Sequence, residues 1–510
     1  MPVNLLIRQF VNPFLLLLCL CLVASCDSYD DFTTERSETL AFDHDSICFD
    51  TLITTIPSAT KTLIVYNHGE KGLRIREIRL AGGAESPFRI NVDGQDLSRS
   101  ENNRATDFEV RRSDSIFVRC EVTVPEQAVD TAVSVEDALL FTLESGLTQR
   151  VVLMAGGQNA WFMRGEVITA DTTLHGGKPI VVYDSLVVAP EATLTLDAGT
   201  QLLFHNKAGL MVHGRLVANG TQEAPVVLRG DRMDHIFDYL TYDRLPGSGI
   251  WEGVTIGPNS TGNRLTYVDL HSSNYGVVCD TTATDTVSSV TVELLSCRLH
   301  NIRGDGLRLG SCRALVRNTE VSNTLGRCVA VTGGVSDFVH CTLAQFYPMS
   351  ANRGEALFLT NRKDSVSFRP LHRLMFVNCV ITGYAEDVLL GDLMENSDYR
   401  AEYFFRNCFI ATVEVNDPVR FVEVVYDKQP VTSLFGTTNS DEDFSSWHNF
   451  KLIDTENFIY DFTPVEQSRL RNIADPSYCQ DMPLDRLGRN RFADGAPDAG
   501  CYEFVPEKTH

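Results

Sequence analysis

The chain has 510 residues, of which 43% are hydrophobic and 22% charged, so it can bury a large core and global disorder is disfavoured. Acidic residues outnumber basic ones by 67 to 44, which gives a formal net charge of −23. This balance argues against nucleic acid as a partner and against broad attachment to anionic lipid, because both need clustered lysine and arginine.

The first 26 residues are predicted to form an export signal. Arg8 precedes the apolar stretch Phe14–Leu22, which is too short to be a stable membrane anchor and is typical of a signal-peptide core. The stretch is followed by Val-Ala-Ser-Cys26, which resembles the lipobox of bacterial lipoproteins, in which the cysteine is diacylated and becomes the new N-terminus. The resemblance implies a lipid anchor at Cys26. The alternative is an ordinary secretory signal that is cleaved nearby.

An acidic stretch, Asp27–Asp31, follows the predicted lipidated cysteine. It resembles the surface-export signal of Bacteroidetes-type lipoproteins, which implies the outer face of the outer membrane, with the periplasmic face as the alternative. Residues 27–45 are polar and lack periodicity, so we expect a flexible tether. No later segment approaches the run of about 18 apolar residues that a membrane-spanning helix requires.

Residues 46–158 are predicted to form an all-β domain. Alternate positions of Ile116–Val124 are apolar, which is the period-two pattern of a strand with one buried face. The run Lys61–Tyr66 predicts another strand, and the turn Asn67–Gly72 follows it. About seven such strands favour an immunoglobulin-like (Ig-like) β-sandwich. With the late run Val151–Gly157, the pattern resembles bacterial Ig-like modules of the abnormal-spindle/Hydin type, which implies a spacer or a binding domain.

Residues 160–415 carry short apolar runs separated by Gly, Asn, Asp and Ser, as in the short strands of a solenoid. After Trp251 a repeat becomes explicit: a small or apolar residue, one variable residue and an aliphatic residue recur. The first positions of this template are Val268, Cys297, Thr319, Cys341, Cys379 and Cys408. A period of about 22 residues with variable insertions predicts coils that stack about 4.8 Å apart.

This repeat is similar to the right-handed parallel β-helix repeat family of pectate-lyase-like shape. The fold class is therefore expected to be all-β, with an Ig-like β-sandwich followed by a right-handed parallel β-helix and a C-terminal cap. Asn301 and Asn323 fall at one turn position in successive coils and are expected to stack. The order of lipobox, Ig-like module and β-helix resembles a group of Bacteroidetes lipoproteins that lends no established activity.

The C-terminal segment carries a second recognisable pattern. Its residues are Asp485, Gly488, Arg491, Gly495, Asp498, Gly500, Tyr502 and Glu503. The pattern resembles the ending of secreted bacterial β-helix proteins. Residues 416–510 are therefore predicted to form a cap with irregular loops that shields the open edge of the last coil.

Eleven cysteines remain after the predicted signal and lipidation site. Their number is odd, and no Cys-x-x-Cys pair or Cys/His cluster has zinc spacing. Most lie in apolar strand contexts, so they are predicted to be small buried hydrophobic residues rather than a disulfide framework. We expect no metal and no other cofactor.

The outward positions of the template offer few paired carboxylates. Asp269 and Glu320 occupy the same template position, and Arg298 occupies it on the coil between them. On the later coils this position carries uncharged residues. Enzymes of this shape need clustered carboxylates, so the row is interpreted as a solvated face with alternating charge, and no catalytic residue is assigned. His271 and His300 share another position. Without a third ligand there, they are interpreted as an exposed or turn-packed pair rather than a metal site.

The insertion Arg229–Gly253 is the candidate ligand-binding loop. It combines aromatic rings, which suit stacking on sugars, with carboxylates and a histidine on a rigid scaffold. The candidate residues are Asp231, Asp234, His235, Phe237, Asp238, Tyr239, Tyr242, Asp243 and Trp251. The alternative is a loop that folds its aromatic side chains onto the flank of the β-helix, with Trp251 in the core of the next coil.

Three functions remain open. The first is a non-enzymatic surface lipoprotein that serves as an elongated platform for a glycan or an outer-membrane protein. The second is a polysaccharide lyase or glycoside hydrolase with a divergent site, which requires that carboxylates of the insertions 345–378 and 382–407 converge over one sheet. Those carboxylates are Glu355, Asp364, Glu386, Asp387, Asp392 and Glu395. The third is an accessory subunit of an outer-membrane protein complex.

Overall fold

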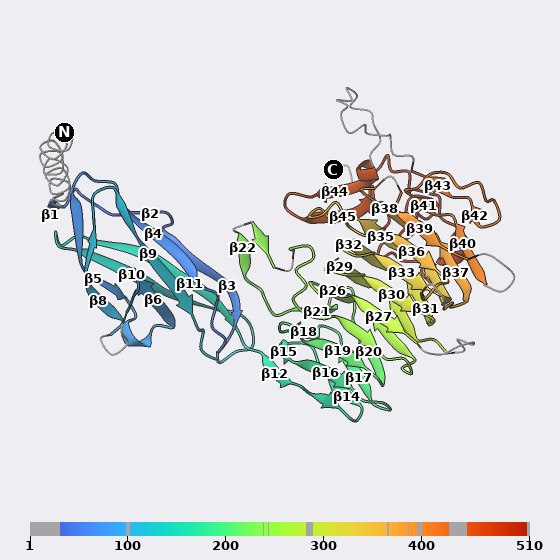
Figure 1. Cartoon of the computed structure of the whole chain (residues 1–510), viewed down its shortest axis with the longest axis horizontal. Coiled ribbons are helices and arrows are strands. Elements are labelled where there is room, and N and C mark those ends of the chain that lie inside the picture. The colour runs from blue at the N-terminus through green and yellow to red at the C-terminus, as the bar shows by residue number, and fades with distance from the viewer. Residues whose placement is uncertain are drawn as a thin grey trace, which may run out of the picture. The chain divides into compact units, whose positions relative to one another are not determined.

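The computed structural model describes residues 31–97, 102–237, 239–242, 244–281, 289–364, 367–385, 387–394, 400–427 and 446–506. The chain divides into two compact units, the first ending at Gln158 and the second containing all later residues together with the short segment 129–131. Nearly all regular structure is β (Figure 1). The short 3₁₀ helices are η1 Gly83–Glu85, η3 Ser446–Asn449 and η4 Pro476–Cys479.

Within these described ranges, no helix has the length and apolar character needed to cross a bilayer. The predicted export signal and lipidation site at Cys26 lie outside the described residues.

The first unit consists of two sheets. One contains β1 Phe32–Thr33, β5 Gly72–Leu80, β10 Val133–Leu143, β11 Thr148–Gln158 and β3 Ser46–Ile53 in this order, with β8 Arg104–Val110 paired to β5. The other contains β2 Ala41–Phe42, β4 Lys61–Asn67, β9 Asp114–Val122, β6 Phe88–Val92 and β7 Gln95–Asp96. The alternation in β9 is the expected one, since Val118 and Cys120 are fully buried whereas Phe117 is exposed. The predicted all-β sandwich is confirmed.

The second unit is a parallel β-helix made of three sheets. The eleven-stranded sheet contains β12 Trp161–Arg164, β15 Ile180–Tyr183, β18 Gln201–Phe204, β21 Val226–Gly230, β26 Val268–His271, β29 Arg298–Ile302, β32 Glu320–Thr324, β35 Thr342–Gln345, β38 Val380–Gly383, β41 Phe409–Ile410 and β43 Val425–Tyr426. The nine-stranded sheet contains β13 Val167–Ile168, β16 Ser185–Val188, β19 Gly209–Val212, β24 Val254–Ile256, β27 Val277–Asp280, β30 Leu307–Gly310, β33 Val329–Thr332, β36 Leu357–Thr360 and β39 Leu389–Asp392. The ten-stranded sheet contains β14 Thr172–Leu174, β17 Thr193–Asp197, β20 Arg215–Asn219, β25 Asn263–Thr266, β28 Val292–Leu295, β31 Arg313–Arg317, β34 Gly334–Val339, β37 Leu371–Val377, β40 Ala401–Arg406 and β42 Phe421–Val422.

The strand register confirms the predicted repeat. Asp269, Arg298, Glu320, Thr342, Val380 and Phe409 pair in succession, each directly after a first template position. The residue before each template position has a positive φ: Tyr267, Ser296, Asn318, His340, Asn378 and Asn407. Asparagine is enriched at such corners because its short polar side chain tolerates the left-handed region. Asn301 and Asn323 share a second left-handed corner and are both buried.

The interior of the β-helix is filled by stacked side chains. Phe338, Phe376, Phe405 and Phe421 lie on successive rungs, with centroid distances of 4.4, 5.3 and 4.9 Å. The described cysteines are free thiols, and all except Cys48 are buried, as predicted. Burial raises the pKa of Cys297 to about 12, so this thiol is protonated and packs as an apolar group.

The C-terminal segment, residues 446–506, covers the outward face of the eleven-stranded sheet. Its hairpin consists of β44 Phe450–Asp454 and β45 Ile459–Pro464. Phe450, Phe462 and Tyr502 pack with Phe346 and Phe409 in a separate core cluster. β42 and β43 still pair with the preceding rung, so the sheets continue past residue 415, where the β-helix was predicted to end. The shielding of the last coil's open edge by residues 416–510 stays a prediction, whereas the described C-terminal segment lies along the side of the sheet. That position decides which outward residues remain accessible.

Candidate functional site

An exposed row of aromatic rings lies on the first rungs of the eleven-stranded sheet. The rings of Phe162 and Tyr183 are stacked with their centroids 6.3 Å apart, and Tyr183 lies 4.7 Å from the imidazole of His205. Phe162 is 41% exposed, and His205 is also exposed. Because these residues come from β12, β15 and the residue after β18, the row crosses three successive rungs. We call Phe162, Tyr183 and His205 the aromatic row.

Charged side chains border the aromatic row. The guanidinium of Arg164 lies 4.0 Å from the centroid of the Tyr183 ring, within cation–π range. His205 Nδ1 lies 2.7 Å from Asp231 Oδ2. Partial burial and the charge of Asp231 raise the pKa of Tyr183, so its hydroxyl is a neutral donor and acceptor. Arg164 and His205 contact the half-buried Tyr183 ring from the two neighbouring rungs, so the row offers ring edges and the exposed part of Phe162, bordered by hydrogen-bonding groups.

Trp161 is a further exposed ring, at 62%, and the Lys178 ammonium lies 4.4 Å from its ring centroid. It lies on the other face of β12 from Phe162, because its register partner Ile180 belongs to the interior core. Of all these residues, the sequence reasoning identified only Asp231. The sequence feature that could have indicated them is the combination of aromatic and cationic residues in Trp161–Arg164, at the start of the β-helix.

The candidate loop forms a short hairpin of β22 His235–Phe237 and β23 Leu240–Thr241, which stands out from the stacked strands of the β-helix (Figure 1). At its end, the rings of Phe237 and Tyr239 stack 5.8 Å apart with an interplanar angle of 12°. These side chains are 57% and 54% exposed. The hairpin therefore presents an aromatic surface to solvent, and the alternative in which all its rings fold onto the flank does not hold for these two.

The other candidate residues of the loop make contacts within the loop or lie in the core. Arg232 forms a bidentate ion pair with Asp234 at 2.7 and 2.6 Å and lies over the ring of Tyr242. His235 is half-buried in β22. Asp238 and Asp243 lie outside the described residues.

Trp251 is fully buried, and its ring stacks on Phe204 at 4.2 Å. Its indole Nε1 donates a hydrogen bond to the backbone carbonyl of His271 at 2.9 Å. A ligand on the surface cannot reach it, so Trp251 leaves the candidate ligand-binding set and belongs to the core.

The charged row on the next rungs is covered. Glu320 is buried, and the side chains of Asp269 and Arg298 are only 23% and 28% exposed, so the interpretation of this row as a solvated face is wrong. Arg298 Nε donates to Glu320 Oε1 at 3.2 Å, and the Tyr502 hydroxyl of the C-terminal segment donates to Glu320 Oε2. Burial opposes the charge on Glu320, but Arg298 and Arg486 outweigh it and lower the pKa of this carboxyl. The alternating charges form a buried network that holds the C-terminal segment in place.

Asp269, His271 and His300 form a compact cluster at the edge of this network. Asp269 Oδ1 accepts hydrogen bonds from His271 Nδ1 at 2.9 Å and from His300 Nε2 at 3.0 Å. Burial and the charge of Arg298 lower the pKa of His300 to about 4, so its imidazole is neutral near pH 7. Burial disfavours the charge on Asp269, but the two histidines together lower the pKa of that carboxyl well below its usual value. The sequence reasoning missed the third member because Asp269 lies at a different template position.

The residues of the C-terminal sequence pattern hold the C-terminal segment on the β-helix. The buried Arg491 donates to Glu503 and, at 2.7 Å, to the side-chain oxygen of Asn318 on the β-helix. Asp485 accepts from the backbone nitrogen of Glu503 at 2.9 Å. These buried residues fix the segment on the sheet and are not available to a substrate.

The carboxylates of the long insertions each have a local partner. Glu355 pairs with Arg327 Nε at 3.1 Å, and Asp392 pairs with Arg362 Nε at 3.4 Å. Asp364 accepts from the backbone nitrogen of Ser367, and Asp387 accepts from the hydroxyl of Thr412. Glu386 and Glu395 lie outside the described residues. Among the carboxylates that the structure places, these contacts support roles in loop structure.

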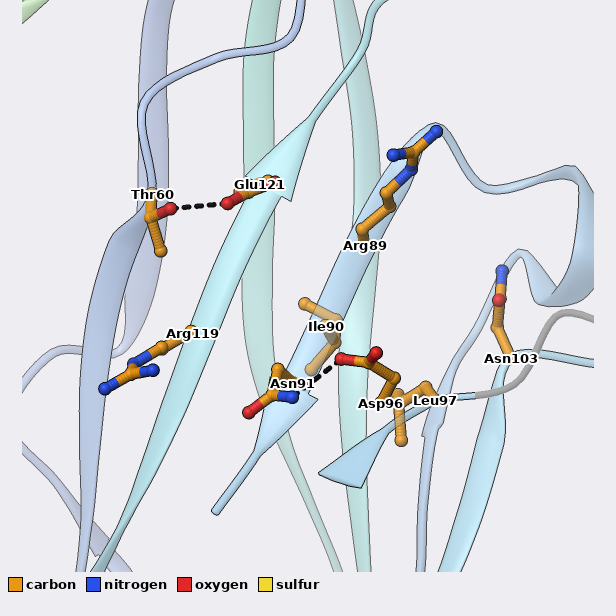
Figure 2. Close-up of a pocket in the computed structure, with 9 residues that line it drawn as sticks. All are labelled: Thr60, Arg89, Ile90, Asn91, Asp96, Leu97, Asn103, Arg119 and Glu121. Atoms are coloured by element: carbon orange, nitrogen blue, oxygen red, sulfur yellow. Dashed lines mark hydrogen bonds between the residues drawn. The ribbon is translucent and has the colours of Figure 1, made fainter. Parts of the chain in front are cut away.

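The first unit carries a separate polar groove of about 560 Å³ (Figure 2). Its lining residues are Thr60, Arg89, Ile90, Asn91, Asp96, Leu97, Asn103, Arg119 and Glu121. Asn91 Nδ2 donates to Asp96 at 2.6 Å, and Thr60 donates to Glu121 (Figure 2). Arg89 and Arg119 contribute two positive charges to the lining of the groove.

No family model and no curated protein matches this chain. Among solved structures, similarity is found to the PapD-like domain 7 of human CEP192, at 15% identity over 25% of this chain and 89% of that one, with a TM-score of 0.17. A protein of unknown function from Porphyromonas gingivalis W83 matches at 14% identity over 27% of this chain and 57% of that one, with a TM-score of 0.17. The catalytic unit of a GH87 alpha-1,3-glucanase from Streptomyces thermodiastaticus matches at 8% identity over 72% of this chain and 88% of that one, with a TM-score of 0.16. At these values the similarities carry no argument about function.

Proposed function

We propose that this protein is a surface lipoprotein whose β-helix binds a glycan through the aromatic row and the exposed hairpin. The observation that carries the proposal is the contact series Phe162–Tyr183–His205 on consecutive rungs. Soluble proteins rarely leave contiguous ring surface exposed unless it contacts a ligand or partner. Exposed aromatic rings that are bordered by polar groups suit the binding of a sugar, because a sugar has an apolar ring face surrounded by hydroxyls. Adjacent rungs lie about 4.8 Å apart, so the row can contact successive residues of one extended chain.

The same geometry favours binding over cleavage. Glycoside hydrolysis normally requires two carboxyl groups on opposite sides of the scissile bond. At the aromatic row, Asp231 is engaged by His205, and the placed carboxylates of the insertions bind Arg327, Arg362 and backbone or hydroxyl donors. Incubation of the protein with any glycan that it binds, followed by analysis for shortened products, tests the enzymatic alternative directly.

The proposed cellular setting rests on the sequence. Cys26 would carry the lipid and attach the protein to the outer face of the outer membrane in a Bacteroidetes-type cell. The predicted tether of residues 27–45 is too long, because β1 Phe32–Thr33 and β2 Ala41–Phe42 already pair within the sheets of the first unit, so the link from the lipid would end before β1. The first unit would then be an Ig-like spacer. Radiolabelled palmitate incorporation that is lost in Cys26→Ser tests the anchor, and degradation of the protein by external protease in intact cells tests the surface location.

A glycan array tests the binding proposal. The full chain with Cys26→Ser should bind a defined set of polysaccharides, and Phe162→Ala and Tyr183→Ala should each weaken binding about tenfold, as expected for loss of about 1.4 kcal/mol of ring contact. Phe117→Ala is the matched control, because this ring is similarly exposed but lies on the first unit. Equal affinity of all variants, or no binding to any glycan, would refute the proposal.

The polar groove supports a second candidate, an accessory subunit of an outer-membrane protein complex. Its lining carries two arginines and two carboxylates, Asp96 and Glu121, which suit a segment of a protein partner that bears charges of both signs. Crosslinking in intact membranes should give one defined adduct, and Arg119→Glu should abolish it. An adduct that persists in Arg119→Glu, or a chain that never crosslinks, would argue against this candidate.

A further inference from the structure

We infer that Asp269, His271 and His300 form a site for a divalent transition-metal ion of the zinc class. The cluster lies on two adjacent strands, β26 and β29, in which His271 and His300 are register partners. One ligand atom from each of the three residues lies within 4.8 Å of the other two. This is a chemical set that Zn²⁺ takes in proteins, since two imidazole nitrogens and one carboxylate leave a further position for water.

The geometry is close to that of a bound ion. Zinc ligand bonds of about 2.0–2.1 Å place neighbouring ligand atoms of a tetrahedral site about 3.3 Å apart. Asp269 Oδ1 lies 2.9 Å from Nδ1 of His271 and 3.0 Å from Nε2 of His300. Around a bound ion these two distances would lengthen by a few tenths of an ångström. The two imidazole nitrogens, which lie within 4.8 Å of each other, would also have to approach the same ion.

The protonation states also suit metal binding. The carboxyl of Asp269 is ionised and the imidazole of His300 is neutral near pH 7, which are the ligand-competent forms of both groups. Arg298 is the nearby cation that would oppose a metal, but its Nε is engaged by Glu320. The added charge is thus offset within the same network.

The cluster lies near the surface but is mostly enclosed. The side chains of Asp269, His271 and His300 are 23%, 10% and 11% exposed, so a narrow path for an ion remains open.

Another histidine–aspartate pair on the β-helix shows what distinguishes this cluster. His175 Nδ1 lies 2.6 Å from Asp197 Oδ2, but these side chains are 75% and 41% exposed, and among the described residues no third ligand completes a group there. An exposed pair of this kind binds metal weakly, because two ligands in water hold an ion poorly. His175 therefore provides a matched control for His300.

The test uses the full chain with Cys26→Ser and Cys48→Ser, which blocks lipidation and removes the exposed thiol. After equilibration with zinc chloride and gel filtration, elemental analysis should find about one zinc per chain in this parent and in His175→Gln. Asp269→Asn and His300→Gln should each retain less than about one tenth of that amount. Cobalt bound in place of zinc should show the absorption bands of nitrogen and oxygen ligands, without a thiolate band.

Circular dichroism identifies which variants are folded. His300→Gln keeps a polar side chain of similar size, so it still tests the metal site if Asp269→Asn does not fold. Zinc should also raise the melting temperature of the parent and not that of His300→Gln. A parent that retains no zinc, or zinc retained equally by the parent and His300→Gln, would overturn the inference.

Discussion

The Tyr502 hydroxyl donates a hydrogen bond to Glu320 Oε2 across 182 residues of sequence. Both residues are buried, and Glu320 also accepts from Arg298 and from the Ser322 hydroxyl. This single contact joins the C-terminal segment to the centre of the eleven-stranded sheet. It also explains why the outward charged row of β26, β29 and β32 is hidden, whereas the aromatic row on the earlier rungs is open to solvent.

Tyr502→Phe should destabilise the protein by about 1–3 kcal/mol, because it leaves one oxygen of a buried carboxylate without its donor. Denaturant unfolding followed by circular dichroism measures the change. Tyr478→Phe is the control, since Tyr478 lies in the same C-terminal segment but only half-buried in η4. Equal unfolding free energies for the two variants would show that the Tyr502 contact does not hold the segment.

Gly500→Ala should detach the C-terminal segment more strongly than Gly495→Ala. Both glycines have a positive φ, of 97° and 129°, so alanine is strained at each. At Gly500 a Cβ would also lie 2.7 Å from Thr342 Oγ1, whereas at Gly495 nothing lies within 4 Å.

We expect a cost at Gly500 that exceeds the cost at Gly495 by about 1–3 kcal/mol, together with faster cleavage of the segment by protease. The comparison isolates the steric contact from the backbone strain. Indistinguishable stability and cleavage of the two variants would contradict the close packing of Gly500 on β35.

Much of the fold follows from local sequence. A residue with a left-handed backbone precedes each template position, as at Asn318 and Asn378, and the next residues alternate between the interior of the β-helix and its outward face. Because each rung repeats the same corner, the register could be read from six short matches. The β-sandwich was equally readable, since β9 alternates with period two.

The candidate site was less predictable because burial depends on distant segments. His271 and His300 look solvent-facing in the repeat, and only the position of Arg486 and Tyr502 shows that this surface is covered. The aromatic row was missed because Phe162, Tyr183 and His205 lie on rungs that precede the explicit repeat, so no template aligned them. Trp251 was assigned to the loop, with the core of the next coil as the alternative, because sequence cannot distinguish a ring that faces solvent from one stacked on Phe204.

Stability should fall as the pH drops from about 6.5 to about 4, in part through His300. The pKa of this imidazole is lowered to about 4 in the folded chain, so between these values the unfolded state binds a proton that the folded state does not. The contribution of His300 is therefore present above pH 6.5 and is lost as the pH falls.

In the presence of a chelator, His300→Gln should show a shallower pH dependence than the parent, by up to about 1.4 kcal/mol per pH unit in this window. Urea unfolding at several pH values measures it. His175→Gln, at an exposed position, should leave the slope unchanged. A parent and His300→Gln with parallel profiles would show that His300 titrates normally.

The two tryptophans Trp161 and Trp251 should respond in opposite ways to substitution. Trp251→Ala removes a fully buried ring that stacks on Phe204, so we expect a loss of about 3–5 kcal/mol of stability. Trp161→Ala removes a ring that is 62% exposed at the first rung, so stability should change by less than about 0.5 kcal/mol. Thermal or denaturant unfolding measures both.

Glycan binding provides a second test of the two residues. Trp161 lies on the other face of β12 from the aromatic row, so Trp161→Ala should leave affinity for the bound glycan unchanged. Trp251→Phe, which keeps an aromatic ring in the core, should also bind as the parent does. If Trp161→Ala lost affinity while remaining folded, the ligand would contact the open end of the first rung rather than the outward aromatic row, and the proposed site would move there.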